Sequence, residues 1–232
     1  ADIIQSNLNP LRSGYPSDGD VEQILSAIDK SNNPLLYVGD GVWKTNSEQQ
    51  VTELAEYFGL GISCPEVDQR SISFKHPHHI GVFSQLGGYL DTYPVEFDPD
   101  FILSIGVRHQ GNGNGEDLAV LKGVKDLYAV GSDIAYLKNY PGLSGAVIAD
   151  ENKFLSRMLE IGQDKFDSAK YSARKRTVKS YAFNTRRFRR EAILKQPVPG
   201  KIRSGLLVDA VDSALEKFGG GYITTEQTAA PF

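Results

Sequence analysis

The sequence predicts an α/β protein built on a doubly wound parallel sheet, with helices on both faces and a helical C-terminal extension. Between residues 34 and 161, short apolar runs of strand length alternate with amphipathic segments of helix length. Glycine or aspartate lies at the end of most of these runs, as expected where a strand turns into the next segment. Strands that alternate with helices form parallel sheets, because each helix carries the chain back along the sheet.

The first strand is predicted where Leu-Leu-Tyr-Val occupies residues 35–38, since the run is short and rich in strand-forming residues. A helix is expected before it at about 21–30, capped by Asp18 or Asp20. A second helix is expected at about 47–58, with Gly59 as its C-cap. The apolar faces of these two helices are predicted to be Val21, Ile24, Leu25 and Ile28 in the first, and Val51, Leu54, Ala55 and Phe58 in the second.

Four further strands follow along the chain. They are predicted at residues 61–64, 101–107, 126–130 and 146–148, and the segment 65–98 between the first two of them reads as irregular. A short helix is expected at 116–122. Another is expected at 151–161, capped by Asp150, with Phe154, Leu155, Met158 and Leu159 facing inward.

The turn Gly39-Asp40-Gly41 after the first strand allows three interpretations. It contains the Gly-x-Gly of a dinucleotide fingerprint, but the third glycine of that fingerprint is absent. It also resembles the opening of the metal–diphosphate motif of thiamine-diphosphate enzymes, yet the window where an asparagine should follow reads CPEVDQR. We favour the third interpretation, in which the two glycines simply turn the chain.

Arg108 follows the predicted strand at 101–107 and is the second candidate contact for a ligand. An arginine just beyond the carboxyl end of a strand can meet an anionic group in the crevice of a parallel sheet. A solvated or interdomain arginine is an equally good interpretation. If the strands at 35–38 and 101–107 are neighbours, then Gly39–Gly41, Gly106 and Arg108 flank one crevice, and a nucleotide would bind there.

His76, His78 and His79 lie together in the irregular segment. A metal site would need these ligands on one side of a fixed scaffold, whereas adjacent side chains on an extended chain point apart. Structural or surface histidines are therefore favoured, and no metal site is expected.

A basic run occupies residues 165–195, with 11 Lys or Arg and two acids. Tyr171, Tyr181 and Phe183 are interleaved with these cations, which is compatible with nucleic-acid binding through phosphate contacts and base stacking. The favoured interpretation is a long surface helix that packs on the acidic body of the protein or on a neighbouring subunit. No nucleic-acid partner is expected.

Composition narrows the class of protein. The net charge is -4, so the surface as a whole does not attract nucleic acid or anionic membranes. Cys64 is the sole cysteine, which agrees with a reducing compartment, and no apolar run reaches the length of a membrane span. We expect a cytoplasmic protein without a membrane partner.

Four segments occur in an order that resembles one known domain. They are residues 34–42 followed by a helix, HPHHIGVF at 76–83, DPDFILSIGVR at 98–108 and VIADENKFLSRML at 147–159. Together they resemble the central domain of thiamine-diphosphate-dependent enzymes of the acetolactate synthase and pyruvate decarboxylase superfamily. The resemblance implies a Rossmann-like sheet of about six strands that lies between two catalytic domains. It also implies a mainly structural role, with FAD, ADP or another nucleotide bound in some members.

The resemblance further implies a division of the chain. Residues 1–33 would be a linker with a leading helix, 34–162 the Rossmann-like central domain, and 163–200 a basic helical connector. Residues 201–232 would be the truncated start of a thiamine-diphosphate-binding domain. In that last part a helix is expected at 203–217, with Leu206, Leu207, Ala210, Val211 and Leu215 inward, and a strand is expected at 222–225.

Several functional expectations follow from the resemblance. Thr225, Glu226 and Gln227 occupy the neighbourhood of the cofactor diphosphate in the family. The family's catalytic glutamate and its metal motif belong to other parts of the enzyme, so this chain is expected to be a fragment with no catalytic residue of its own. Thiamine diphosphate and magnesium would belong to the parent enzyme, a lyase or transferase. The expected partners are its other domains or subunits, in a homodimer or homotetramer. The alternative is a nucleotide-binding module with its own FAD, NAD or ADP.

Overall fold

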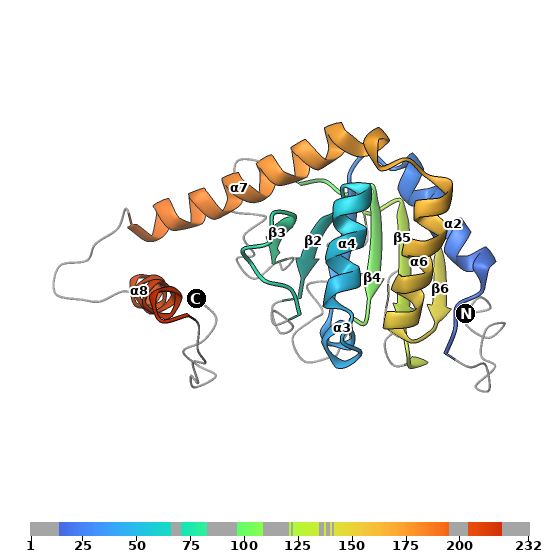
Figure 1. Ribbon diagram of the computed structural model, residues 1–232, viewed down its shortest axis with the longest axis horizontal. Helices are drawn as coiled ribbons and strands as arrows, with labels where there is room; N and C mark the ends of the chain where they lie inside the picture. Colours follow the sequence, from blue (N-terminus) through green and yellow to red (C-terminus); the bar gives the residue numbers. More distant parts are fainter. Residues whose placement is uncertain are drawn as a thin grey trace. The chain divides into compact units, whose positions relative to one another are not determined.

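The computed structural model describes residues 14–65, 71–82, 97–108, 121, 123–134, 137, 140, 142–194 and 204–219 (Figure 1). The chain divides into two compact units, residues 1–185 and residues 186–232. The first unit contains the sheet, and the second contains the end of one long helix and all of the last helix. None of the described helices is both long enough and apolar enough to cross a membrane.

Six parallel strands form one sheet in the order β3-β2-β1-β4-β5-β6. Their bounds are β1 Pro34–Val38, β2 Gly61–Cys64, β3 His79–Val82, β4 Phe101–Ile105, β5 Asp126–Gly131 and β6 Gly145–Ile148. The chain builds outward from β1 to one edge, returns, and builds outward from β4 to the other edge. This is the strand order of the Rossmann fold, and the predicted α/β fold class is confirmed. The strand order reverses between β1 and β4, which pair from Pro34↔Phe101 to Val38↔Ile105.

The sheet contains one strand that the residues alone did not predict. The five strands expected from the sequence are present, with β4 ending at Ile105 rather than at residue 107. β3 lies inside the segment 65–98 that was expected to be irregular. It is a four-residue edge strand that begins with a histidine and includes a glycine, so its composition gives little strand signal.

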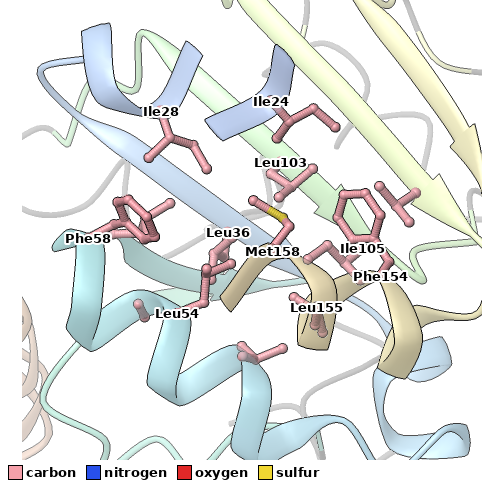
Figure 2. Packing of buried hydrophobic residues seen from close by; sticks show 14 of the residues in the cluster. Ile24, Ile28, Leu36, Leu54, Phe58, Leu103, Ile105, Phe154, Leu155 and Met158 are labelled. Carbon is pink, nitrogen blue, oxygen red and sulfur yellow. The ribbon is translucent and has the colours of Figure 1, made fainter. Parts of the chain in front are cut away.

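Three helices cover one face of the sheet. They are α2 Asp18–Lys30, α4 Glu48–Phe58 and α6 Glu151–Lys165, with α6 packed against both of the others (Figure 1). Figure 2 shows their apolar side chains meeting those of β1 and β4 in one cluster, which includes Ile24, Ile28, Leu36, Leu54, Phe58, Leu103, Ile105, Phe154, Leu155 and Met158. The predicted inward faces of all three helices are buried, because apolar residues three and four positions apart share one side of a helix.

The opposite face of the sheet is covered by the start of the basic run. A short 3-10 helix, η3 Ser168–Tyr171, leads into α7 Ser172–Leu194. Val178, Tyr181 and Ala182 of α7 are buried with Leu35, Tyr37, Ile102 and Leu127 of the sheet. Neighbouring residues of β1 therefore serve different cores, since successive side chains of a strand point to opposite faces.

Two helix ends agree with the predicted caps and one does not. The Asp150 side chain accepts a hydrogen bond from the Lys153 N–H at the start of α6, and Gly59 ends α4 in the left-handed conformation at φ 71°. The prediction that Asp18 or Asp20 caps α2 is wrong. Ser17 is the N-cap and accepts from the Asp20 N–H at 3.1 Å, so both aspartates lie in the first turn, where the helix dipole favours them.

The second unit contains the helix expected near its start. α8 spans Ser204–Lys217, but Leu207 and Ala210, predicted to face inward, are exposed. The prediction is wrong for these two residues, whereas Val211 and Leu215 are half-buried. The predicted strand at 222–225 and nearly all of the predicted helix at 116–122 lie outside the described residues.

Candidate functional site

The loops after β1 and β4 meet at the point where the strand order reverses. The Gly39 N–H donates to the Ile105 carbonyl at 3.0 Å, and the Gly41 N–H donates to the Gly106 carbonyl at 3.0 Å. The structure therefore brings together three of the predicted site glycines. Two of the amide groups that could have faced a phosphate at this turn therefore already have protein partners.

The glycines at this point allow the two backbones to touch. A Cβ atom at Gly39 would lie 2.4 Å from the Gly106 carbonyl oxygen, and one at Gly41 would lie 2.6 Å from the Gly106 Cα. Gly106 itself has φ +61°, a conformation that side chains rarely adopt. Close packing between two loops accounts for all three positions, which agrees with the favoured interpretation of the turn.

Asp40 begins a five-residue helix, α3 Asp40–Lys44, and its carboxylate forms an ion pair with Lys44 one turn later. Its other oxygen, Oδ1, is buried and has no hydrogen-bond partner among the described residues. The described residues contain no group of three or more His, Cys, Asp or Glu that could hold a metal ion. Asp40 is thus a single acidic side chain at this turn, and it belongs to no set of three metal ligands among the described residues.

Arg108 lies two residues beyond Gly106 and is partly buried. β1 and β4 are neighbours, so Arg108 and the Gly39–Gly41 turn follow adjacent strands at the same edge of the sheet. This is the juxtaposition that the sequence predicted if the two strands paired. Thr225, Glu226 and Gln227, the remaining predicted site residues, lie outside the described residues.

A buried carboxyl group lies at the same edge and was not recognised from the sequence. Glu151, the first residue of α6, is fully buried, and its Oε1 accepts from the Ser132 N–H at 3.1 Å and from the Ser132 hydroxyl at 3.3 Å. Its Oε2 is buried without a hydrogen-bond partner among the described residues. Burial raises the pKa of Glu151. A Cβ atom at Gly41 would lie 2.8 Å from Oε1, so this acid lies directly beside the glycine contact.

His78 and His79 are buried at β2 and β3, and His76 beside them is half-buried. The His78 ring Nδ1 lies 2.8 Å from the Leu60 carbonyl and therefore donates to it, while its Nε2 is buried without a hydrogen-bond partner in the described chain. Burial lowers the pKa of His78, which keeps the ring neutral. The His79 Nδ1 accepts from the Gly81 N–H at 3.2 Å, and the His76 Nε2 lies 3.4 Å from Glu56 Oε1.

Asp100 connects the turn after α2 to the start of β4. It lies at the opposite edge of the sheet from the switch point, which is the place between β1 and β4 where the strand order reverses. Its carboxylate accepts from the Ser31 hydroxyl, from the Asn32 N–H at 2.8 Å and from the Asn33 N–H at 2.9 Å. Burial by itself would raise the pKa of Asp100, but these three donors outweigh it and hold the pKa below its ordinary value.

The first cations of the basic run contact the acidic helix α2. Lys165 Nζ lies 2.7 Å from Glu22 Oε1, and Lys170 Nζ lies 2.6 Å from Asp29 Oδ1. These pairs, together with the buried residues of α7, place the beginning of the run on the body of the first unit, as the favoured interpretation predicted. Exposed pairs of this kind contribute at most about 1 kcal/mol each.

Comparison with known proteins agrees with this architecture. The model of the family described as "Thiamine pyrophosphate enzyme, central domain" matches residues 21–158, which run from α2 through the six strands into α6.

The similar proteins are much longer than this chain. Acetolactate synthase of Arthrospira platensis is 27% identical over 114 residues, which are 47% of this chain and 19% of that protein. The acetolactate synthase large subunit of Corynebacterium glutamicum is 23% identical over 145 residues, 62% of this chain and 23% of that protein. The chain thus spans about a fifth of the length of the curated relatives it matches.

Solved structures share the fold. The thiamine diphosphate-dependent 4-hydroxybenzoylformate decarboxylase of Rhodococcus jostii superposes with a TM-score of 0.51 at 21% identity, covering 65% of this chain and 28% of that one. Benzoylformate decarboxylase of Polynucleobacter necessarius gives a TM-score of 0.51 at 19% identity, covering 63% of this chain and 27% of that one.

Proposed function

The chain belongs to the family of thiamine pyrophosphate enzyme central domains, and from that premise we propose that it is the structural core of an enzyme acting on 2-oxo acids. The parent would be a thiamine diphosphate- and magnesium-dependent lyase or transferase of the acetolactate synthase or decarboxylase type. The names of the similar proteins support this class of parent reaction.

One observation carries the structural role. At the switch point, where Rossmann-type sheets bind their ligands, the two backbones are in direct contact. Gly39 donates to the last residue of β4, Gly41 donates to the loop after it, and Glu151 is buried beside them. A phosphate would gain little here, because the Gly39 and Gly41 N–H groups are already hydrogen-bonded to protein carbonyls and a carboxyl group is buried beside them. The edge is built to hold two loops together.

Thiamine diphosphate would supply the carbanion chemistry of the parent enzyme, together with a glutamate that activates it and a cation that holds its diphosphate. We place neither function in this chain. Its contribution is a rigid sheet that positions the catalytic parts of the parent enzyme. The partners are those other domains or subunits, in a homodimer or homotetramer, and the compartment is the cytoplasm.

The first test is cofactor binding by the chain alone. Because we place neither the glutamate nor the cation site in this chain, we expect no tight binding of thiamine diphosphate with Mg²⁺ and no decarboxylation of pyruvate. Isothermal titration calorimetry measures the first and carbon dioxide release the second. Micromolar affinity in the calorimeter would contradict the proposal.

A second candidate function is a nucleotide-binding module, supported by the position of Arg108 at the β1/β4 edge. Since the Gly39 and Gly41 amides are committed, the phosphate of FAD, NAD or ADP would depend on Arg108 for a charge-assisted contact. Such a contact is worth about 1.5–3 kcal/mol. For any nucleotide that binds, Arg108→Ala should therefore weaken affinity about tenfold or more.

Arg187→Ala is the matched control, because Arg187 lies in the second unit and pairs with Glu191 in its own helix. The Arg187→Ala variant should bind the nucleotide with the same affinity as the unmodified chain. Unchanged affinity in Arg108→Ala would remove the β1/β4 crevice from consideration as the nucleotide site.

A further inference from the structure

A cavity of about 300 Å³ lies at the opposite edge of the first unit, between the turn after α2 and the start of α7. The polar side chains that matter for its chemistry are those of Asp29, Asn32, Asn33, Lys170, Arg174 and Thr177. This volume is at the lower end of small-molecule sites. The cavity is separate from the Gly39–Gly41 edge, and the proposed function makes no use of it.

Arg174 gives the cavity a cation that no carboxylate neutralises by direct contact. Its guanidinium donates to the Phe58 carbonyl at 3.1 Å and to the Ser31 carbonyl. No carboxylate of the described residues lies within ion-pair distance of it, whereas Arg157 pairs with Asp18 and Glu160. These two contacts use two of its five N–H donors, so others remain for a ligand.

Asp29, the single acid in this lining, already has two hydrogen-bond donors. Asp29 accepts from Lys170 Nζ at 2.6 Å and from the Tyr171 hydroxyl at 2.7 Å. Burial alone would raise the pKa of Asp29, but these two donors outweigh it and lower the pKa, so the group is ionised near neutral pH. With Lys170 and Arg174 positive and Asp29 negative, the lining carries one net positive charge.

The remaining groups suit an oxyanion. The Lys170 ammonium has three N–H donors, of which one contacts Asp29, and the Asn32 side chain adds an amide donor. The Thr177 hydroxyl donates to the Ala173 carbonyl at 3.2 Å, so it can only accept from a ligand. Arg174, Lys170 and Asn32 are therefore the groups of the lining that can donate to an oxyanion.

We propose that this cavity binds a compact oxyanion, the phosphoryl or carboxylate group of a small metabolite, through Arg174 and Lys170. Arg174 presents a planar fork that matches two oxygens of such a group, and Lys170 supplies a point charge. An anion bound there would contact both the end of α2 and the beginning of α7. It would thereby stabilise the packing of α7 on that face of the sheet.

The test uses inorganic phosphate and acetate, each titrated at constant ionic strength against chloride, with backbone amide shifts recorded by NMR. Saturable shifts are expected at Asn32, Asn33 and Thr177. A response to phosphate alone assigns a phosphoryl ligand, and a response to acetate alone assigns a carboxylate. The absence of saturation with both anions would overturn the proposal.

Two lysine variants separate specific binding from general attraction to a basic surface. Lys170→Gln should weaken the anion at least fivefold, while Lys165→Gln should leave it unchanged, because Lys165 makes the same kind of exposed pair with α2 outside the cavity. Arg174→Lys keeps the charge but loses the planar fork, and should also weaken binding. An equal loss of anion affinity in Lys170→Gln and Lys165→Gln would contradict the proposal that the anion binds in this cavity.

Discussion

At the scale of single residues, the contact between the loops at the switch point requires glycine, because there is no room for a Cβ atom. Gly39 has φ -108°, which any residue can adopt, so its requirement for glycine is purely steric. The space for its Cβ is filled by the Gly106 carbonyl and by the Val107 Cα, 2.5 Å away. Backbone on both sides leaves no flexible side chain that could move aside.

Gly39→Ala should therefore destabilise the first unit by about 1–3 kcal/mol, the usual cost of overpacking. The free energy of unfolding from urea titration measures the change. A loss below the error of that titration would show that the loops separate freely.

Gly19→Ala is the matched control, since a Cβ there meets only the Ser17 hydroxyl at 4.0 Å. Gly19 lies in the first turns of α2, where alanine is the better helix former. This change should stabilise the protein by about 0.4–1 kcal/mol, because it restricts the unfolded chain.

Glu151 shows what single residues of the sequence could not predict. It follows the correctly predicted cap Asp150, and an acid in the first turn of a helix is usually an exposed partner of the helix dipole. Here the loops after β1 and β5 enclose it through Gly41 and Ser132. Both residues are distant in the sequence, so the residues around Glu151 could not predict these contacts. The sequence predicted that the loops after β1 and β4 are neighbours if these strands pair, but it did not predict that their backbones are in contact.

At the scale of elements, the helices were predictable because each carries its own signals. α2, α4 and α6 have apolar residues at helical spacing, and α4 and α6 have the caps that the sequence indicated. β3 lacked such a signal. It is defined by pairing with β2 and by buried histidines, so its existence depends on its neighbours rather than on its composition.

The stability of β3 should depend on pH through His78. Its folded pKa is lowered below 6.5 chiefly by burial, with His76 and Lys179 adding to the effect while the Leu60 carbonyl and Glu56 oppose it. The stability it contributes is therefore present above 6.5 and is lost as pH falls toward the lowered pKa. Burying an imidazolium whose Nε2–H has no acceptor costs free energy.

Hydrogen exchange, corrected for its intrinsic pH dependence, measures this change. Protection of residues 80–82 should fall several-fold between pH 7 and pH 5 relative to residues 101–105, and His78→Gln should remove most of the difference. An equal loss of protection in the two strands would assign the pH dependence to global unfolding instead.

At the scale of the whole molecule, the two edges of the first unit differ in character. At the carboxyl edge, loops are joined backbone to backbone around Glu151. At the amino edge, Asp100 and Arg174 tie the turn after α2 to β4 and to α7. The fold class could be predicted from alternating strands and helices, while the closure of the carboxyl edge could not, because it arises only after the crossovers have brought distant loops together.

Native mass spectrometry of the purified chain, together with its absorbance spectrum, tests the central claim most directly. If the domain is structural and its switch point is occupied by its own backbone, the chain should have the 25.5 kDa mass of the polypeptide and no flavin absorbance. FAD, NAD or ADP retained at close to one molecule per chain, and lost on Arg108→Ala, would contradict the claim and establish a nucleotide site at the β1/β4 edge.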